Sequence, residues 1–183
     1  MDETRTFTEA HIKRQRRSHA EADGYGRHRH LYLQNPMVEL ATEIARQQGR
    51  TPAWLDYGCG KGGFIEEIRK LGVFGEIVGW DPAVDAFKVK PEGKFDIVTC
   101  LDVLDAIEPN FTEAVIVDVA RATAGVAIFD VLTRPKATSK LKPHPPFYWT
   151  HIVGRAMRVL KSRVEFPGMD SFERVVIFAE PKG

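Results

Sequence analysis

The chain has 183 residues, a formal net charge of +1 and a hydrophobic content of 43%, values that are typical of one globular domain with a real core. Its longest apolar runs, such as residues 125–132, have the length of a strand, so no membrane-spanning helix is expected. The start of the chain lacks the apolar segment of a secretion signal, and two cysteines are too few for a disulfide framework, which predicts a cytoplasmic protein.

Residues 1–30 differ in composition from the rest and form a basic, histidine-rich arm before the main domain, residues 31–183. Two interpretations of residues 1–23 stay open. The positive charges bind a substrate or a phosphate, or the segment is a solvated, partly helical extension. Residues 24–30, GYGRHRH, are expected to be flexible because two glycines surround Tyr25. Neither a cysteine nor an HExxH motif accompanies the histidines, so no metal site is predicted.

The fold is organised around residues 51–65, TPAWLDYGCGKGGFI. A helix is predicted before this stretch, from Pro36, which suits a first turn, to Gly49, which suits a helix end. The stretch itself begins with a short apolar strand that ends at Asp56, continues with four glycines and passes into a helical apolar pattern. Strand, glycine loop and helix form the opening unit of a nucleotide-binding α/β fold. The glycines allow the backbone to turn sharply and to lie close to a ligand.

A second strand is predicted at residues 76–80 and ends at Asp81 and Pro82. A carboxylate at this point binds a ribose in many nucleotide-binding folds, although Asp-Pro is also an ordinary way to begin a turn. A third strand is predicted at residues 95–100, and only twelve residues, 83–94, separate it from Pro82. A complete repeat of helix, strand and loop needs roughly 30 residues. We therefore expect one strand and helix layer to be missing after the second strand.

The second half of the chain is predicted to complete the sheet. The expected elements are a helix at 109–121, a central strand at 125–132, a loop at 133–146, a helix at 147–160 and an edge hairpin of strands at 164–166 and 172–179. Asp130 interrupts the central apolar run and must be either paired or functional, because burial of an unpaired charge is costly. His151 is expected to be a packing residue of the last helix.

The glycines at 58, 60 and 63 fit the GxGxxG pattern, so NAD has to be considered. Asp56 argues against NAD, because a carboxylate two residues before the first glycine opposes a pyrophosphate and suits an ammonium group. The chain is also short for a dehydrogenase with its own substrate domain, and it has no GxxxxGK[ST] motif for ATP.

Three segments resemble motifs of the class I S-adenosylmethionine-dependent methyltransferases. LDYGCGKGGF is similar to the first motif of that family, IVGWDP to the second and KFDIVTCLDVLDAIEP to the fourth. The resemblance covers about residues 31–181 and includes the order, the spacing and the final hairpin. It implies a Rossmann-like three-layer α/β sandwich with a mostly parallel sheet, and S-adenosylmethionine as the cofactor.

The resemblance also assigns the residues that bind the cofactor. Asp56 and the backbone of Gly58, Cys59 and Gly60 would lie beside its methionine part, and Asp81 with Pro82 would hold the ribose. Leu101, Asp102 and Val103 would line the pocket near the adenine and the sulfonium. The shortened segment 83–94 departs from the family pattern and leaves the adenine contact unassigned, with Phe87 or the turn at 101–103 as candidates.

The expected reaction is in-line displacement of a methyl group from a sulfonium, which needs a base only when the nucleophile carries a proton. The candidate bases are His144, Asp102, Asp105 and Asp130, and His144 is equally well explained as an exposed loop residue. The residues predicted to line the acceptor pocket are Tyr25, Arg27, Tyr148 and Trp149, although aromatic residues are more often part of a core. The favoured acceptor is a small molecule. Nucleic-acid methylation, other chemistry on the cofactor and a cofactor-binding protein without catalysis stay open.

Overall fold

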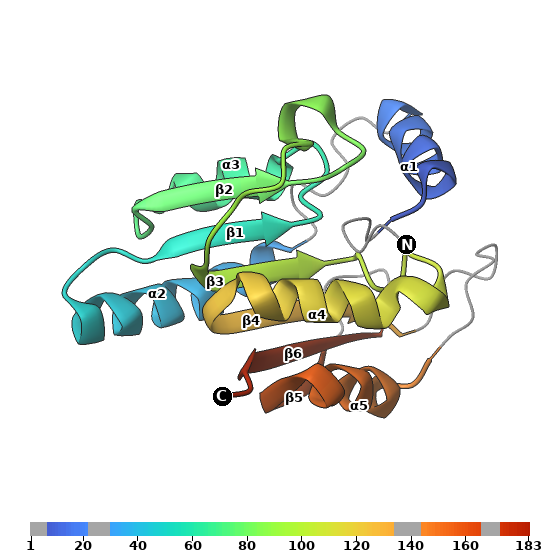
Figure 1. Ribbon diagram of the computed structural model, residues 1–183. Coiled ribbons are helices and arrows are strands. Elements are labelled where there is room, and N and C mark those ends of the chain that lie inside the picture. The colour runs from blue at the N-terminus through green and yellow to red at the C-terminus, as the bar shows by residue number, and fades with distance from the viewer. Residues whose placement is uncertain (1–6, 22–29, 134–143, 166–172) are drawn as a thin grey trace.

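The computed structural model describes residues 7–21, 30–133, 144–165 and 173–183, and its centre is a sheet of six strands in the order β2-β1-β3-β4-β6-β5 (Figure 1). The strands are β1 (Ala53–Tyr57), β2 (Glu76–Trp80), β3 (Phe95–Leu101), β4 (Thr123–Leu132), β5 (Met157–Glu165) and β6 (Arg174–Pro181). The neighbouring pairs β2–β1, β1–β3 and β3–β4 are parallel, whereas β6 is antiparallel to both β4 and β5. The mostly parallel sheet and the antiparallel hairpin at its end confirm the predicted fold class.

Helices cover both faces of the sheet, as expected for a three-layer sandwich (Figure 1). One face is packed by α2 (Gln34–Gln48) and α3 (Gly63–Arg69), and the other by α4 (Thr112–Ala122) and α5 (Pro146–Ala156). The two central strands are β3, which is buried along its whole length, and β4, which is buried from Ala127 to Val131. This explains why their sequences are nearly continuous apolar runs.

The connection between β2 and β3 contains one short 3-10 helix, η2 (Asp85–Phe87), and no strand, so β2 lies at an edge of the sheet. The prediction that one strand and helix layer is missing is therefore confirmed. Trp80, the last residue of β2, is nevertheless buried. The ammonium group of Lys90 lies 5.4 Å from the centre of its ring, and the ring of Phe7 from the N-terminal arm lies 5.9 Å away. A lysine and a residue of the arm thus cover the strand end beside the missing layer.

The last helix is shorter than predicted. It ends at Ala156, and residues 157–160, which were assigned to it, begin strand β5. The apolar spacing that runs from Trp149 to Val153 continues to Met157, which is buried in the sheet rather than on the helix. A short apolar pattern does not separate a helix from a strand, and here pairing with β6 decides the conformation. Residues 167–171, which join the two predicted strands of the hairpin, lie outside the described residues.

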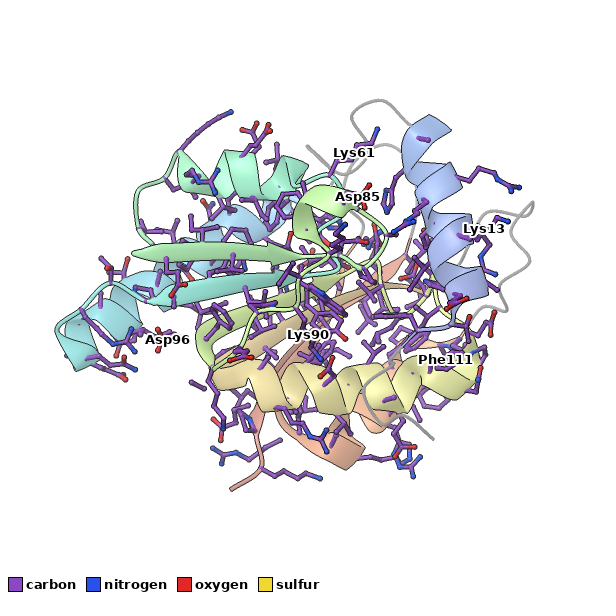
Figure 2. The ribbon with its side chains drawn as sticks, turned by 45° about the horizontal axis from the view of Figure 1, so that its top comes forward. Lys13, Lys61, Asp85, Lys90, Asp96 and Phe111 are labelled. Atoms are coloured by element: carbon purple, nitrogen blue, oxygen red, sulfur yellow. The ribbon has the colours of Figure 1, made fainter. Side chains whose placement is uncertain are left out.

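Helix α1 (Glu9–Glu21) lies across the ends of β1 and β2 where the glycine loop begins (Figures 1 and 2). Its first turn is anchored by Phe7 and His11, whose rings stack 5.4 Å apart and are buried. The rest of the helix exposes most of its basic side chains, including Lys13 (Figure 2). Within the described part of the chain, no helix combines the length and the apolarity that a membrane crossing requires.

Candidate functional site

The glycine loop follows β1 at the carboxyl edge of the sheet and leads into α3. Gly58 and Gly60 have φ angles of 80° and 54°, in the left-handed region that glycine adopts without strain. A Cβ atom at Gly58 would lie 2.4 Å from a methyl carbon of Val103, so the loop packs directly on the turn after β3. The backbone N–H groups of Gly58 and Cys59 both donate to the carbonyl oxygen of Trp80, at 2.7 and 3.1 Å. The loop is therefore fixed to the ends of two neighbouring strands.

Asp56 lies under this loop and is buried. Its Oδ1 accepts a hydrogen bond of 2.7 Å from the hydroxyl group of Thr99 on β3, and that hydroxyl oxygen accepts one of 2.9 Å from the indole N–H of Trp54. Burial raises the pKa of Asp56 to about 6, against the lowering effect of the Thr99 hydrogen bond and the charge of His30. A carboxylate that is costly to ionise in this way is well suited to a cationic ligand.

Asp81 is the second buried carboxylate of the site and follows β2 directly. Its Oδ2 accepts a hydrogen bond of 2.9 Å from the backbone N–H of Gly60, and its Oδ1 accepts one of 2.8 Å from that of Ala83. Each oxygen keeps a further lone pair, so the side chain is oriented by the backbone and is still able to accept hydrogen bonds from a ligand. Pro82 lies in the same turn and is partly exposed.

Leu101, Asp102 and Val103 form the turn that faces the glycine loop from β3. Leu101 and Val103 are buried, and Asp102 has a φ angle of 56°, which aspartate tolerates better than most residues. The turn is fixed from the neighbouring strand, because the N–H group of Asp102 donates to the carbonyl oxygen of Asp130 at 2.9 Å. The structure thus brings the predicted cofactor residues of three strands together at one edge of the sheet.

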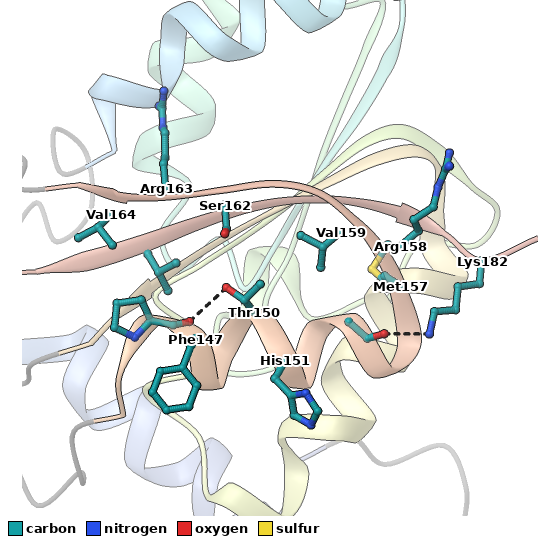
Figure 3. Close-up of a pocket in the computed structure, with 13 residues that line it drawn as sticks. Phe147, Thr150, His151, Met157, Arg158, Val159, Ser162, Arg163, Val164 and Lys182 are labelled. Carbon is teal, nitrogen blue, oxygen red and sulfur yellow. Dashed lines mark hydrogen bonds between the residues drawn. The ribbon is translucent and has the colours of Figure 1, made fainter.

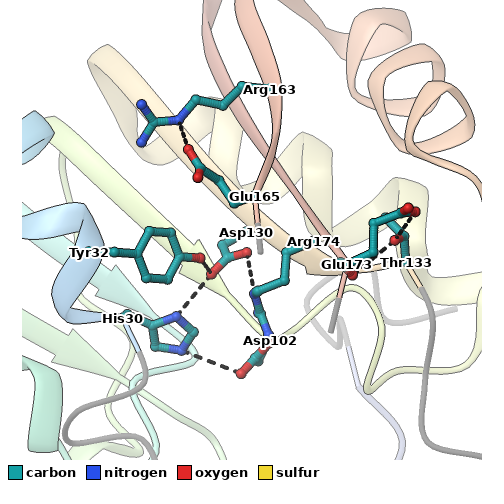
Figure 4. Close-up of polar contacts among 9 residues, drawn as sticks. All are labelled: His30, Tyr32, Asp102, Asp130, Thr133, Arg163, Glu165, Glu173 and Arg174. Atoms are coloured by element: carbon teal, nitrogen blue, oxygen red, sulfur yellow. Dashed lines mark hydrogen bonds and ion pairs between the residues drawn. The ribbon is translucent and has the colours of Figure 1, made fainter. Parts of the chain in front are cut away.

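A buried polar network extends from Asp102 into the sheet (Figure 4). Asp130 on β4 is fully buried and accepts hydrogen bonds from Nδ1 of His30 at 2.9 Å, from Nε of Arg174 at 2.8 Å and from the hydroxyl group of Tyr32. Arg174 also donates to the carboxylate of Asp102, and Nε2 of His30 lies 3.4 Å from it. Of the two alternatives for Asp130, the structure therefore shows a paired carboxylate.

The charges of this network are balanced. Burial on its own would lower the pKa of His30, but hydrogen bonds and attraction from Asp102 and Asp130 raise it to about 9, so the imidazole is protonated at neutral pH. Two carboxylates then face two cations, His30 and Arg174. In the sequence, Asp130 indicates that a buried partner exists. No pattern identifies the partners, because His30 lies 100 residues before Asp130 and Arg174 lies 44 residues after it.

The structure describes only some of the residues that were predicted to act in catalysis or to bind the acceptor. Asp105 lies three residues after Asp102, burial raises its pKa, and its Oδ1 has no hydrogen-bond partner among the described residues. The ring of His144 stacks on that of Tyr148 with 4.1 Å between their centres and meets that of Trp149 edge-on at 5.6 Å. This aromatic group begins α5, which follows the carboxyl end of β4, so it lies at the same edge of the sheet as the glycine loop. Tyr25 and Arg27 lie outside the described residues.

The structure also places Phe87 and His151. The role of Phe87 as an adenine contact stays a prediction. Phe87 packs against Gly62 and Gly79 on the α3 side of the sheet, where a Cβ at Gly62 would lie 2.8 Å from its ring. His151 is exposed rather than packed, so that prediction was wrong. Its side chain lines an open hollow of about 930 Å³ between α5 and the hairpin of β5 and β6, and none of the predicted cofactor residues lines this hollow (Figure 3). In the described ranges no group of three or more His, Cys, Asp or Glu side chains is arranged to hold a metal ion.

The fold and the geometry define an α/β protein with a candidate ligand site at the carboxyl edge of its sheet, built on a glycine loop between two acidic strand ends. A family described as "Methyltransferase domain" matches residues 25–160, and the chain belongs to this family. Its membership of the class I S-adenosylmethionine-dependent methyltransferases, predicted from three motifs, is thereby confirmed. Solved proteins that share the fold contain S-adenosylhomocysteine or S-adenosylmethionine, in agreement with the predicted cofactor.

Solved structures share the fold at low sequence identity. The N-methyltransferase NodS from Bradyrhizobium japonicum WM9, in complex with S-adenosylhomocysteine, has a TM-score of 0.63 at 14% identity, over 94% of this chain and 99% of that one. The 1,6-didemethyltoxoflavin-N1-methyltransferase from Burkholderia thailandensis has a TM-score of 0.69 at 13% identity, over 95% and 89%. Magnesium protoporphyrin IX methyltransferase from Synechocystis PCC 6803 has one of 0.59 at 15% identity, over 95% of each chain. No curated protein sequence matches this chain significantly.

Proposed function

We propose that this protein transfers a methyl group from S-adenosylmethionine to an oxygen or nitrogen atom of a small-molecule acceptor. One observation carries the proposal. Asp56 and Asp81, at the ends of two adjacent strands, flank a glycine loop whose backbone amide at Gly60 is bonded to Asp81. This arrangement offers one buried carboxylate to an ammonium group and another to the hydroxyl groups of a ribose, which are separate parts of the same cofactor.

The residues of the site fit the cofactor in a defined order. Asp56 and the backbone of 58–60 would hold the methionine part, and Asp81 the ribose. Leu101 and Val103 offer apolar surface on the opposite side of the loop. When bound, S-adenosylmethionine supplies an electrophilic methyl group on a sulfonium that is already a good leaving group. The contribution of the protein is therefore to position the acceptor in line with that group and to exclude water.

Proton removal is needed only for an acceptor that reacts from a protonated atom. Asp102 is bonded to Arg174 and faces His30, so we assign it a positioning role instead of the role of a base. Asp105 and His144 are the proposed proton acceptors. Burial raises the pKa of Asp105 and so strengthens its hold on a proton. Cys59 is no candidate nucleophile, because burial raises the pKa of its thiol.

The proposal of a small-molecule acceptor is supported by two neighbours whose names state such acceptors, a didemethyltoxoflavin and magnesium protoporphyrin IX. The aromatic group of His144, Tyr148 and Trp149 is the proposed flat surface for the acceptor, because stacked rings offer an apolar face with polar edges. Tyr25 and Arg27 complete the proposal from the segment before α2.

The test is mass spectrometry after incubation of the full chain with S-adenosylmethionine, labelled in its methyl group, and a metabolite extract. The expected result is one labelled product with S-adenosylhomocysteine in equal amount, and none with the Asp81→Ala variant. A rearranged cofactor, or label found only in added RNA or DNA, would replace the small-molecule assignment with the corresponding alternative. Binding of the cofactor with no turnover in any extract would indicate a non-catalytic role.

A further inference from the structure

Helix α1 makes contacts with three segments that are far apart in the sequence. Arg14 lies 3.7 Å from Glu108, in the turn after β3, and Arg16 lies 3.7 Å from Asp85, in the connection after β2. These pairs are more than one third exposed and contribute little energy on their own. Their positions nevertheless place the helix beside both the connection after β2 and the turn after β3, the two strands that flank β1 and its glycine loop (Figure 2).

His19, near the end of the helix, points at the cofactor site itself. Its Nε2 lies 3.8 Å from Oδ2 of Asp81, and its Cε1 would lie 3.3 Å from a Cβ atom at Gly60. The imidazole is largely buried, with a side-chain exposure of 19%. At 3.8 Å the ring and the carboxylate face each other without a hydrogen bond. Nε2 of His19 and Oδ2 of Asp81 can therefore both form hydrogen bonds with one ligand group placed beside them.

The other end of α1 is held by the core. The ring of Phe7 is buried against Trp80, the residue before Asp81, and stacks on His11. This apolar anchor lies beside β2, which is an edge strand because the next strand and helix of the family pattern are missing. The helix is therefore attached at its start and reaches the site with its later turns.

We propose that α1 forms the wall of the cofactor site on the side of the missing layer, and that His19 contacts the ribose of the bound cofactor together with Asp81. The inference rests on the proposed function, since it assumes that Asp81 holds the ribose. In this arrangement a ribose hydroxyl group donates a hydrogen bond to the carboxylate of Asp81. The tautomer of His19 decides whether its Nε2 donates a hydrogen bond to the ribose or accepts one. The arm thus supplies a cofactor-binding residue that neither of the two interpretations of its sequence included.

Calorimetric titration of the full chain with S-adenosylhomocysteine tests the contact. His19→Ala is expected to weaken binding about fivefold or more, the usual effect of losing one or two hydrogen bonds. Ser18→Ala, on an exposed neighbouring position of the same helix, is the matched control and should bind as the wild type does. His19→Gln keeps a side-chain donor and is expected to recover at least half of the lost affinity on a logarithmic scale.

A double-mutant cycle separates a contact at the ribose from a general loosening of the helix. Because His19 and Asp81 share one ligand group in the proposal, His19→Ala combined with Asp81→Asn should weaken binding by clearly less than the product of the two single effects. Hydrogen exchange supplies a readout besides affinity. The amides of residues 9–21 should exchange at least fivefold more slowly when S-adenosylhomocysteine is added.

The outcomes distinguish the two proposals. If the wild type does not bind S-adenosylhomocysteine, the proposed function fails. If it binds and Asp81→Asn weakens binding, but His19→Ala equals Ser18→Ala and exchange in α1 is unchanged, the function stands and the role of α1 is refuted. Fully multiplicative effects of the two substitutions, or no recovery with His19→Gln, would likewise refute the contact of His19 with the ribose.

Discussion

Replacing Asp56 by Asn should separate stability from cofactor binding. The side chain is buried, and its pKa is raised from an ordinary 3.8 to about 6 because burial disfavours the charged form. At about 1.36 kcal/mol per pH unit, ionising Asp56 in the folded protein costs roughly 3 kcal/mol at neutral pH. Asparagine has the same shape and still accepts the hydrogen bond from Thr99, but it carries no charge.

The variant is therefore expected to be as stable as the wild type or more stable, by up to about 3 kcal/mol, when the two are unfolded with urea at pH 7.5. The sign follows from the raised pKa. Between pH 4 and 6 the folded state binds more protons than the unfolded state, so the contribution of Asp56 becomes less unfavourable as the pH falls through about 6. The advantage of the variant should accordingly shrink towards pH 4.

Cofactor binding should change in the opposite direction. Without the negative charge, the affinity for S-adenosylhomocysteine is expected to fall at least tenfold at pH 7.5, as is typical of a lost charge-assisted hydrogen bond. The wild type should lose affinity as the pH is lowered below about 6, whereas the variant should show a flatter profile. A variant that is destabilised by more than about 1 kcal/mol and binds as tightly as the wild type would refute the assignment.

Three further substitutions test other parts of the site. Asp81→Ala should weaken cofactor binding at least tenfold by calorimetry, and unchanged affinity would remove the ribose assignment. Gly58→Ala should lower the free energy of unfolding in urea by about 2–4 kcal/mol, because the positive φ strains alanine and the added Cβ clashes with Val103. The control is Gly49→Ala, at a similar φ with no atom within 4 Å of the added Cβ, which should lower it by only about 1 kcal/mol. His30→Gln should flatten the loss of stability that the wild type shows as the pH rises through about 9, because the raised pKa of His30 stabilises the fold only while the ring is protonated. Parallel curves would contradict this.

The sequence predicted the sheet well because its signals are local. The apolar runs before Asp56 and before Asp81 each predict a strand that leads to a carboxylate, and the parallel pairing of β1 and β2 then places these strand ends together. The missing layer was predicted in the same way, from the length of one connection. The end of α5 was not predicted correctly, because the residues after Ala156 are apolar enough for either a helix or a strand.

The polar network could not be predicted because its members carry no common signal. His30 belongs to a basic segment that was interpreted through its charge, and Arg174 begins a strand that was identified by its apolar residues. Only the position of Asp130 indicated that a partner exists. His19 is a similar case, since a histidine in a charged helix has no periodicity that points to a distant glycine.

The position of β6 has a consequence for folding. It is the last strand in the sequence, yet it lies between β4 and β5 in the sheet. β5 pairs only with β6 in the described structure, so during synthesis it has no place in the sheet until residues 174–181 are available. Until then Asp130 also lacks the guanidinium group of Arg174. We therefore expect the sheet to be completed only when the final hairpin of β5 and β6 is added.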